Sequence, residues 1–156
     1  MVRVEVVKMA SKTFTNLSQL ESYLNEKIKI ALDKNVAPVV KESIQTAVSD
    51  VVYGAGSPNW YIRRNLRDGS LGDVGEMNHE ISGNTLIVTD DAKSKLPWNN
   101  GRSLAENIEY GYGENWYSES RPFINGEDGA KNILREDGSH IEAMKDGLRS
   151  LGLTVV

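Results

Sequence analysis

The segment LSQLESYLNEKIKIALDKNVAPVVKESIQTAVSDVVY (residues 17–53) decides the fold. Apolar residues recur in it every three or four positions, while charged residues occupy much of the remaining surface. The apolar positions are Leu17, Leu20, Leu24, Ile28, Ala31, Val36, Val39, Val40, Ile44, Ala47, Val48 and Val51. This spacing predicts helix through the segment, and we interpret it as the core helix of the domain.

Capping residues suggest where this helix begins and where it is interrupted. Thr15 or Asn16 is suited to the N-cap. Asn35 is a second candidate cap, and Pro38 would then lie in a first turn, where its missing N–H costs little. Either two helices meet there or one long helix kinks. We expect one kinked helix or two nearly collinear ones, because a two-residue break leaves little room for reversal.

Composition limits the class of protein. A chain of 156 residues is large enough for one domain with a buried core, so we expect a single domain over residues 1–156. The net charge of −4 argues against a generally basic nucleic-acid-binding face. The absence of cysteine excludes disulfides, thiolate metal sites and cysteine nucleophiles. The start lacks a signal-peptide pattern, so a soluble protein made in the cytoplasm is expected.

The other elements are shorter. Alternating valines predict a strand at 2–9. All glycines lie from Gly54 onward, where a long loop at 54–73, with a short helical or strand turn at 60–66, is expected. The remaining expectations are strands at about 75–82 and 85–90 around Gly83-Asn84, a helix Leu104–Tyr110 capped by Ser103, a helix over 130–135, a last helix capped by Ser139 and ended by Gly152, and an edge strand at 153–156. The fold class is α+β: a long N-terminal helix packed on a small antiparallel sheet with a C-terminal helix.

The stretch NIEYGYGENWYSESRPF (residues 107–123) is the most distinctive part of the chain. It holds five aromatic residues, two alternating glycines and an Arg-Pro pair, and no nucleophile with an adjacent base. Tyr and Trp favour surfaces that are half apolar and half wet. The stretch therefore indicates a protein interface or buried sheet edge, with a small-ligand pocket as the alternative. A long loop is expected at 111–120.

A second candidate surface combines aromatic and basic residues. Trp60 and Tyr61 lie close to Arg63, Arg64 and Arg67. This cluster could bind a protein partner, form a solvated face paired with nearby acids, or contact nucleic acid through phosphate and stacking.

Metal and acid–base chemistry have weak signals. His79 and His140 have no second ligand at metal spacing, so structural or surface roles are expected. Asp90 and Asp91 follow a strand, but adjacent acids more often cap a loop than bind a metal. We expect no metal, no cofactor and no catalytic residue.

The order of several motifs resembles the neck and tail-completion proteins of long-tailed bacteriophages that infect Gram-positive hosts. There, a long helix precedes a Val-Tyr…Tyr-x-Arg-Arg segment, a Gly-rich continuation, a hairpin, an Ile-Glu-x-Gly-like segment, an Arg-Pro-Phe and a final amphipathic helix. The matching residues are Val52-Tyr53, Tyr61-Ile62-Arg63-Arg64, Gly69–Asp73, Ile108-Glu109-Tyr110-Gly111, Arg121-Pro122-Phe123 and Ile141–Leu153. The resemblance covers most of residues 17–153, although the loops 54–73 and 111–120 depart from the family's shorter members.

The resemblance implies a non-enzymatic virion protein that forms a ring, usually six-fold, at the end of the tail tube. Its partners would be further copies of itself, the tail tube or tail terminator protein, and the head connector or stopper protein. DNA would pass through the ring without specific binding, and no membrane would be involved. The protein would be assembled in the host cytoplasm and reside in the neck or tail.

The interface candidates combine the two aromatic segments. They are Trp60, Tyr61, Arg63, Arg64, Arg67, Glu109, Tyr110, Trp116, Tyr117, Arg121 and Phe123. Two alternatives stay open. An enzyme or ligand-binding domain for small polar substrates would use Arg63, Arg64, His79 and the tyrosines around 110–117. A nucleic-acid-binding module would use residues 60–67.

Overall fold

A computed structural model describes residues 14–54, 69–93, 103–111 and 120–156. The strand expected at 2–9 and the short turn of structure expected at 60–66 lie outside these residues. The described part is α+β, with a long N-terminal helix, a two-stranded antiparallel sheet and C-terminal helices, as the sequence predicted.

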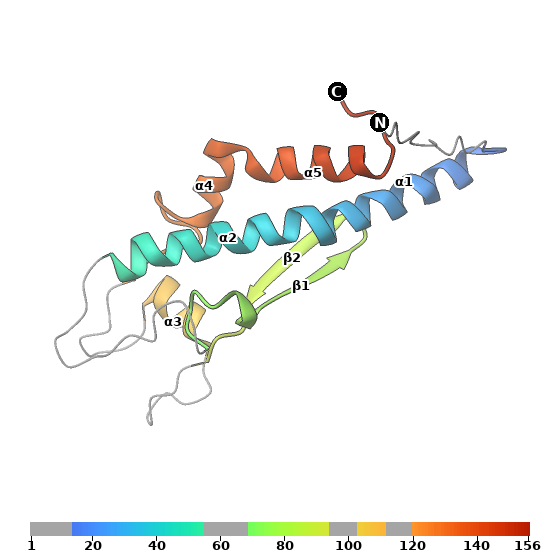
Figure 1. Ribbon diagram of the computed structural model, residues 1–156. Coiled ribbons are helices and arrows are strands. Elements are labelled where there is room, and N and C mark those ends of the chain that lie inside the picture. Colours follow the sequence, from blue (N-terminus) through green and yellow to red (C-terminus); the bar gives the residue numbers. More distant parts are fainter. Residues whose placement is uncertain (1–13, 55–68, 94–102, 112–119) are drawn as a thin grey trace, which may run out of the picture.

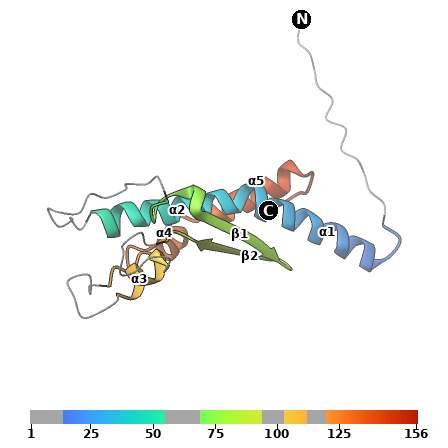
Figure 2. The same cartoon turned by 90° about the horizontal axis from the view of Figure 1, so that it is seen from below.

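One long helix runs through the first half of the chain. It consists of α1 (Leu17–Ala31), η1 (Leu32–Val36), α2 (Ala37–Ala47) and η2 (Val48–Tyr53), where η1 and η2 are π-helical. Asn16 is its N-cap, with the side-chain oxygen accepting the Gln19 N–H at 2.9 Å. The sequence predicted one kinked helix or two nearly collinear ones, and the structure has the first: the helix is continuous, and Figure 2 shows α1 inclined to α2.

The interruption near Asn35 differs in kind from the expected cap. Asn35 lies inside η1, and the Ala37 N–H donates to the Leu32 carbonyl, five residues back. Pro38 has no N–H, and its ring crowds the carbonyl four residues earlier in an α-helix. A wider π turn before Pro38 relieves that contact without ending the helix. The polar and proline signals therefore mark a change of winding, not a new helix start.

A hairpin follows the first glycine-rich region. Strands β1 (Met77–Ser82) and β2 (Thr85–Asp90) pair antiparallel, with His79 opposite Val88. Gly83 has a φ of 62° in the predicted turn, a backbone angle that glycine adopts without a steric penalty. The first strand begins two residues later than expected, because the side chain of Asp73 caps the short 3-10 helix η3 (Val74–Glu76) before it.

Three helices make up the rest of the described chain: α3 (Leu104–Tyr110), α4 (Ala130–Asp137) and α5 (Ser139–Ser150). Ser103 caps α3 as predicted, accepting the Glu106 N–H at 3.3 Å. The cap assigned to Ser139 is wrong, because Ser139 is the first residue of α5 and Gly138 is the cap. Gly138 has a φ of 64°, which lets one residue end α4 and start α5.

The edge strand expected at 153–156 does not form. Gly152, the predicted helix stop, has a φ of 86°, and the Leu153 N–H donates to the Leu148 carbonyl at 3.0 Å. This bond turns the chain back onto the end of α5, as in a Schellman cap. The sheet of the described residues therefore keeps two strands.

The long helix separates two layers. Figure 1 shows α4 and α5 on one side of it and the hairpin on the other. Gly147 of α5 meets η1 so closely that an added Cβ would lie 2.8 Å from the Asn35 side-chain oxygen and 3.0 Å from the Ala31 Cβ. In the described part of the chain, no helix is long and apolar enough to cross a membrane.

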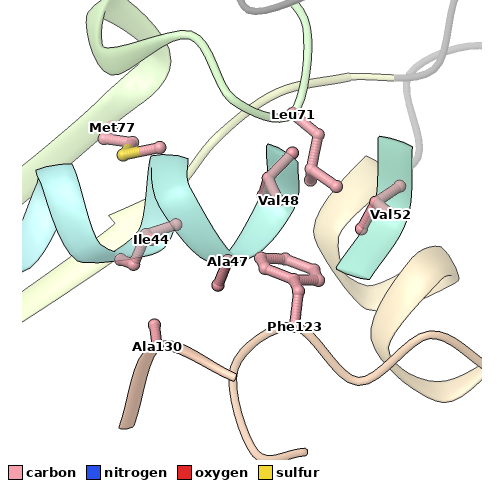
Figure 3. Packing of buried hydrophobic residues seen from close by; sticks show 8 residues of the cluster. All are labelled: Ile44, Ala47, Val48, Val52, Leu71, Met77, Phe123 and Ala130. Carbon is pink, nitrogen blue, oxygen red and sulfur yellow. The ribbon is translucent and has the colours of Figure 1, made fainter. Parts of the chain in front are cut away.

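The core lies at the C-terminal half of the long helix. Its buried members are Ile44, Ala47, Val48, Val52, Leu71, Met77, Phe123 and Ala130. Figure 3 shows the Phe123 ring against Ala47 and Val48, with Leu71 between Val48 and Val52. Residues from the loop before η3, from β1 and from the segment before α4 thus meet on one helix.

Candidate functional site

The structure describes four of the interface candidates: Glu109, Tyr110, Arg121 and Phe123. The other seven lie outside the described residues: Trp60, Tyr61, Arg63, Arg64, Arg67, Trp116 and Tyr117. The four described candidates come together where the end of α3 meets the segment that leads to α4.

Glu109 is the polar centre of this region. Glu109 is only 5% exposed, and one of its carboxylate oxygens accepts the Ile124 N–H at 2.8 Å. The other oxygen accepts the Asn125 N–H at 2.9 Å and the Asn125 side-chain amide at 2.6 Å. A buried carboxylate is tolerated only with such partners. Glu109 therefore fastens the turn after Phe123 to α3.

Arg121 connects the same segment to the end of the long helix. Its guanidinium donates to the Val52 carbonyl at 3.0 Å, and its backbone N–H donates to the Ile108 carbonyl at 2.8 Å. The last carbonyls of a helix have no partner within the helix, and a cation there also complements the helix dipole. The preceding Ser120 hydroxyl donates to the Glu109 carbonyl at 2.6 Å. Arg121 thus binds η2 to α3.

Phe123 and Tyr110 have opposite environments. Phe123 is 0% exposed and belongs to the core, whereas Tyr110 is 70% exposed at the last residue of α3. Gly111 follows with a φ of 71°, so the chain leaves α3 through a backbone conformation that favours glycine. Of the described candidates, Tyr110 is the aromatic residue that a partner could reach without moving the core.

His79, assigned to the alternative pocket, lies elsewhere in the fold. Its Nε2 is 2.9 Å from Asp33 Oδ1, so it joins β1 to η1. The described residues include no group of three or more His, Cys, Asp or Glu side chains arranged to hold a metal ion.

Asp90, at the end of β2, has an unusual environment. Its Oδ1 accepts the Ala92 N–H at 2.9 Å, while its buried Oδ2 has no hydrogen-bond partner among the described residues. Burial raises the pKa of Asp90 to about 7, and the charges of Asp91, Glu76 and Asp73 act in the same direction. Asp90 is therefore a titrating group at the base of the hairpin.

We expect Asp90 to make stability pH-dependent. Its folded pKa of about 7 lies above the usual 3.8, so the folded state holds this proton more tightly. The stability that the protonated Asp90 contributes is full below pH 3.8, falls as the pH rises towards 7, and is absent above that. The side chain introduced by Asp90→Asn cannot ionise. At pH 8 this variant should therefore unfold at a higher denaturant concentration than the wild type, and the difference should be smaller at pH 5.

The matched control is Asp91→Asn, which removes a neighbouring exposed charge but leaves Asp90 ionisable. It should keep most of the wild-type decline between pH 5 and 8, as measured by urea unfolding. The same decline in Asp90→Asn as in the wild type would contradict the assignment.

Sequence reasoning missed two residues that complete the surroundings of Glu109. Asn125 touches the carboxylate, and Lys131 Nζ donates to the Asn125 side-chain oxygen at 2.5 Å. Lys131 was expected only to lie in the helix over 130–135, and Asn125 was not among the candidate residues. No spacing rule pairs them with Glu109, because that contact is set by how α3 docks against the turn.

Comparison with known proteins gives one family. No curated protein and no solved structure matches the chain. Residues 16–150 match the YomN family, a range that contains every element from α1 to α5. The chain therefore belongs to the YomN family, whose phage-type gene name indicates a phage protein.

Proposed function

We propose that the protein is a non-enzymatic structural component of the phage head–tail junction, a neck or tail-completion protein that forms a ring at the end of the tail tube. The motif order from the long helix to the last amphipathic helix supports this role, and so does membership of a family with a phage-type name. In this role the ring contacts further copies of itself, the tail tube or terminator, and the head connector or stopper. DNA passes through its centre.

The observation that carries the proposal is the position of two exposed apolar side chains. Leu17 is 83% exposed at the start of α1, and Tyr110 is 70% exposed at the end of α3. Arg121 ties α3 to Val52, near the other end of the long helix. The helix spans about 55 Å at 1.5 Å per residue, and Figure 1 shows the start of α1 and α3 towards opposite ends of the molecule.

Exposed apolar sites at opposite ends suit a head-to-tail contact between copies. In such a contact one patch meets a different patch on the next copy, and the chain of contacts closes into a ring when the rotation allows. A two-fold dimer instead places the same patch on both sides of the contact.

Substitution at the two ends tests this arrangement. We expect Leu17→Ser and Tyr110→Ala each to lower the association constant of the contact between copies by about tenfold, the effect of losing roughly 1.4 kcal/mol per contact. Analytical ultracentrifugation over a range of protein concentrations measures that constant. Ile141→Ser is the matched control, since Ile141 is 51% exposed on α5. Equal loss in all three variants, or in none, would contradict the end-to-end contact.

A further inference from the structure

The side chains of Lys131, Asn125 and Glu109 form a connected row. Lys131 Nζ donates to Asn125 Oδ1 at 2.5 Å, and Asn125 Nδ2 donates to Glu109 Oε1 at 2.6 Å. The charges on either side fix the orientation of the amide, because an ammonium donates only to the oxygen and a carboxylate accepts only from the nitrogen. An amine, an amide and a carboxylate thus lie in one hydrogen-bonded row, with the amine at the amide oxygen and the carboxylate at the amide nitrogen.

We propose that Lys131 and Asn125 form an intramolecular isopeptide bond, with Glu109 carrying the proton. The neutral Lys131 amine attacks the side-chain carbonyl carbon of Asn125, and the new bond joins Nζ to Cγ. Glu109 accepts a proton from the attacking nitrogen and returns it to Nδ2. The bond from Cγ to Nδ2 then breaks and ammonia leaves. No oxidant, reductant or co-reactant is needed.

Backbone hydrogen bonds hold together the two segments that carry the nucleophile and the electrophile. The Lys131 N–H donates to the Ile124 carbonyl at 3.2 Å, and the Ala130 N–H donates to the Phe123 carbonyl at 2.8 Å. The Asn125 N–H is bound to Glu109 itself. Fixing the reacting groups in one geometry replaces an encounter with a unimolecular step and can be worth many orders of magnitude in effective concentration.

The Glu109 carboxylate lies next to the nitrogen that leaves. Glu109 is 5% exposed, and it touches the nitrogen that must leave. A positioned general base and acid accelerates such a transfer by about 10²–10⁴-fold. Asn125 and Lys131 are themselves exposed, so water can remove the ammonia.

The bond would close a covalent ring over residues 125–131. This ring would lock the turn that follows Phe123 to the first residues of α4, above the buried carboxylate. The activity is independent of the head–tail proposal, because all the reacting atoms lie within one chain.

Intact-mass spectrometry of the purified full chain tests the bond. After incubation at alkaline pH, we expect the wild type to lose the mass of one ammonia. Lys131→Arg keeps the charge of an exposed side chain but lacks the attacking amine, so it should keep its full mass. A proteolytic digest of the wild type should contain a branched peptide that joins Asn125 to Lys131.

Succinimide formation between Asn125 and Gly126 is a competing reaction that also releases ammonia. Hydroxylamine cleaves a succinimide but leaves an isopeptide bond intact, and Lys131→Arg would still form the succinimide. Loss of ammonia that persists in Lys131→Arg, or an unchanged wild-type mass, would overturn the proposal. Glu109→Gln should slow the loss by about 100-fold or more in whatever fraction folds, which identifies the proton carrier.

Discussion

Phe123→Ala should lower the free energy of unfolding by about 3–5 kcal/mol, the usual cost of truncating a buried phenylalanine. The ring is 0% exposed and packs with residues from η2, from the loop before η3 and from α4. Its loss leaves a cavity where these segments meet. Urea unfolding followed by circular dichroism measures the change.

Tyr110→Ala is the matched control for this substitution. It also removes an aromatic ring, but from a side chain that is 70% exposed, so its cost should stay within about 0.5 kcal/mol. The pair separates stability from assembly, since Tyr110→Ala is expected to weaken the ring and Phe123→Ala the fold. Equal costs for the two variants would show that Phe123 does not hold the core together.

Glu109→Ala should cost about 3 kcal/mol, the upper part of the range for leaving buried hydrogen-bond donors unsatisfied. The carboxylate accepts the N–H groups of Ile124 and Asn125 as well as the Asn125 amide. Without it, the turn after Phe123 should detach from α3. The Arg121 N–H donates to the Ile108 carbonyl, so its hydrogen exchange should be faster in the variant than in the wild type.

Glu106→Ala provides the comparison for Glu109→Ala. Glu106 is a carboxylate on the same helix, but it is exposed, and a charge in the first turn contributes only about 0.3–1 kcal/mol. If Glu109→Ala lowered the free energy of unfolding as little as Glu106→Ala, water would be replacing the carboxylate, and the site would not be closed to solvent.

Local signals explain which parts of the fold could be predicted. The helix from Leu17 to Tyr53, the Gly83-Asn84 turn and the Ser103 cap all depend on residues within a few positions of one another. The errors occur where two local signals compete. Ser139 is a good cap by type, but the left-handed Gly138 beside it already makes the turn between α4 and α5.

The candidate site was harder to predict because its contacts are distant in sequence. Arg121 donates to Val52, 69 positions away, and Glu109 accepts from residues 15 and 16 positions away. The periodicity of apolar residues along the sequence does not reveal contacts between residues so far apart. Residue type alone placed Phe123 beside Tyr110 as similar aromatic candidates, yet one lies in the core and the other on the surface.

Incubation of the purified protein with isolated tail tubes of a phage that encodes it tests the proposed role most directly. Electron microscopy of the tube ends, with co-sedimentation of the protein, gives the readout. The head–tail junction account predicts a ring at one end of each tube and a sedimenting protein. Tubes with bare ends and a protein that stays monomeric in the supernatant would contradict it.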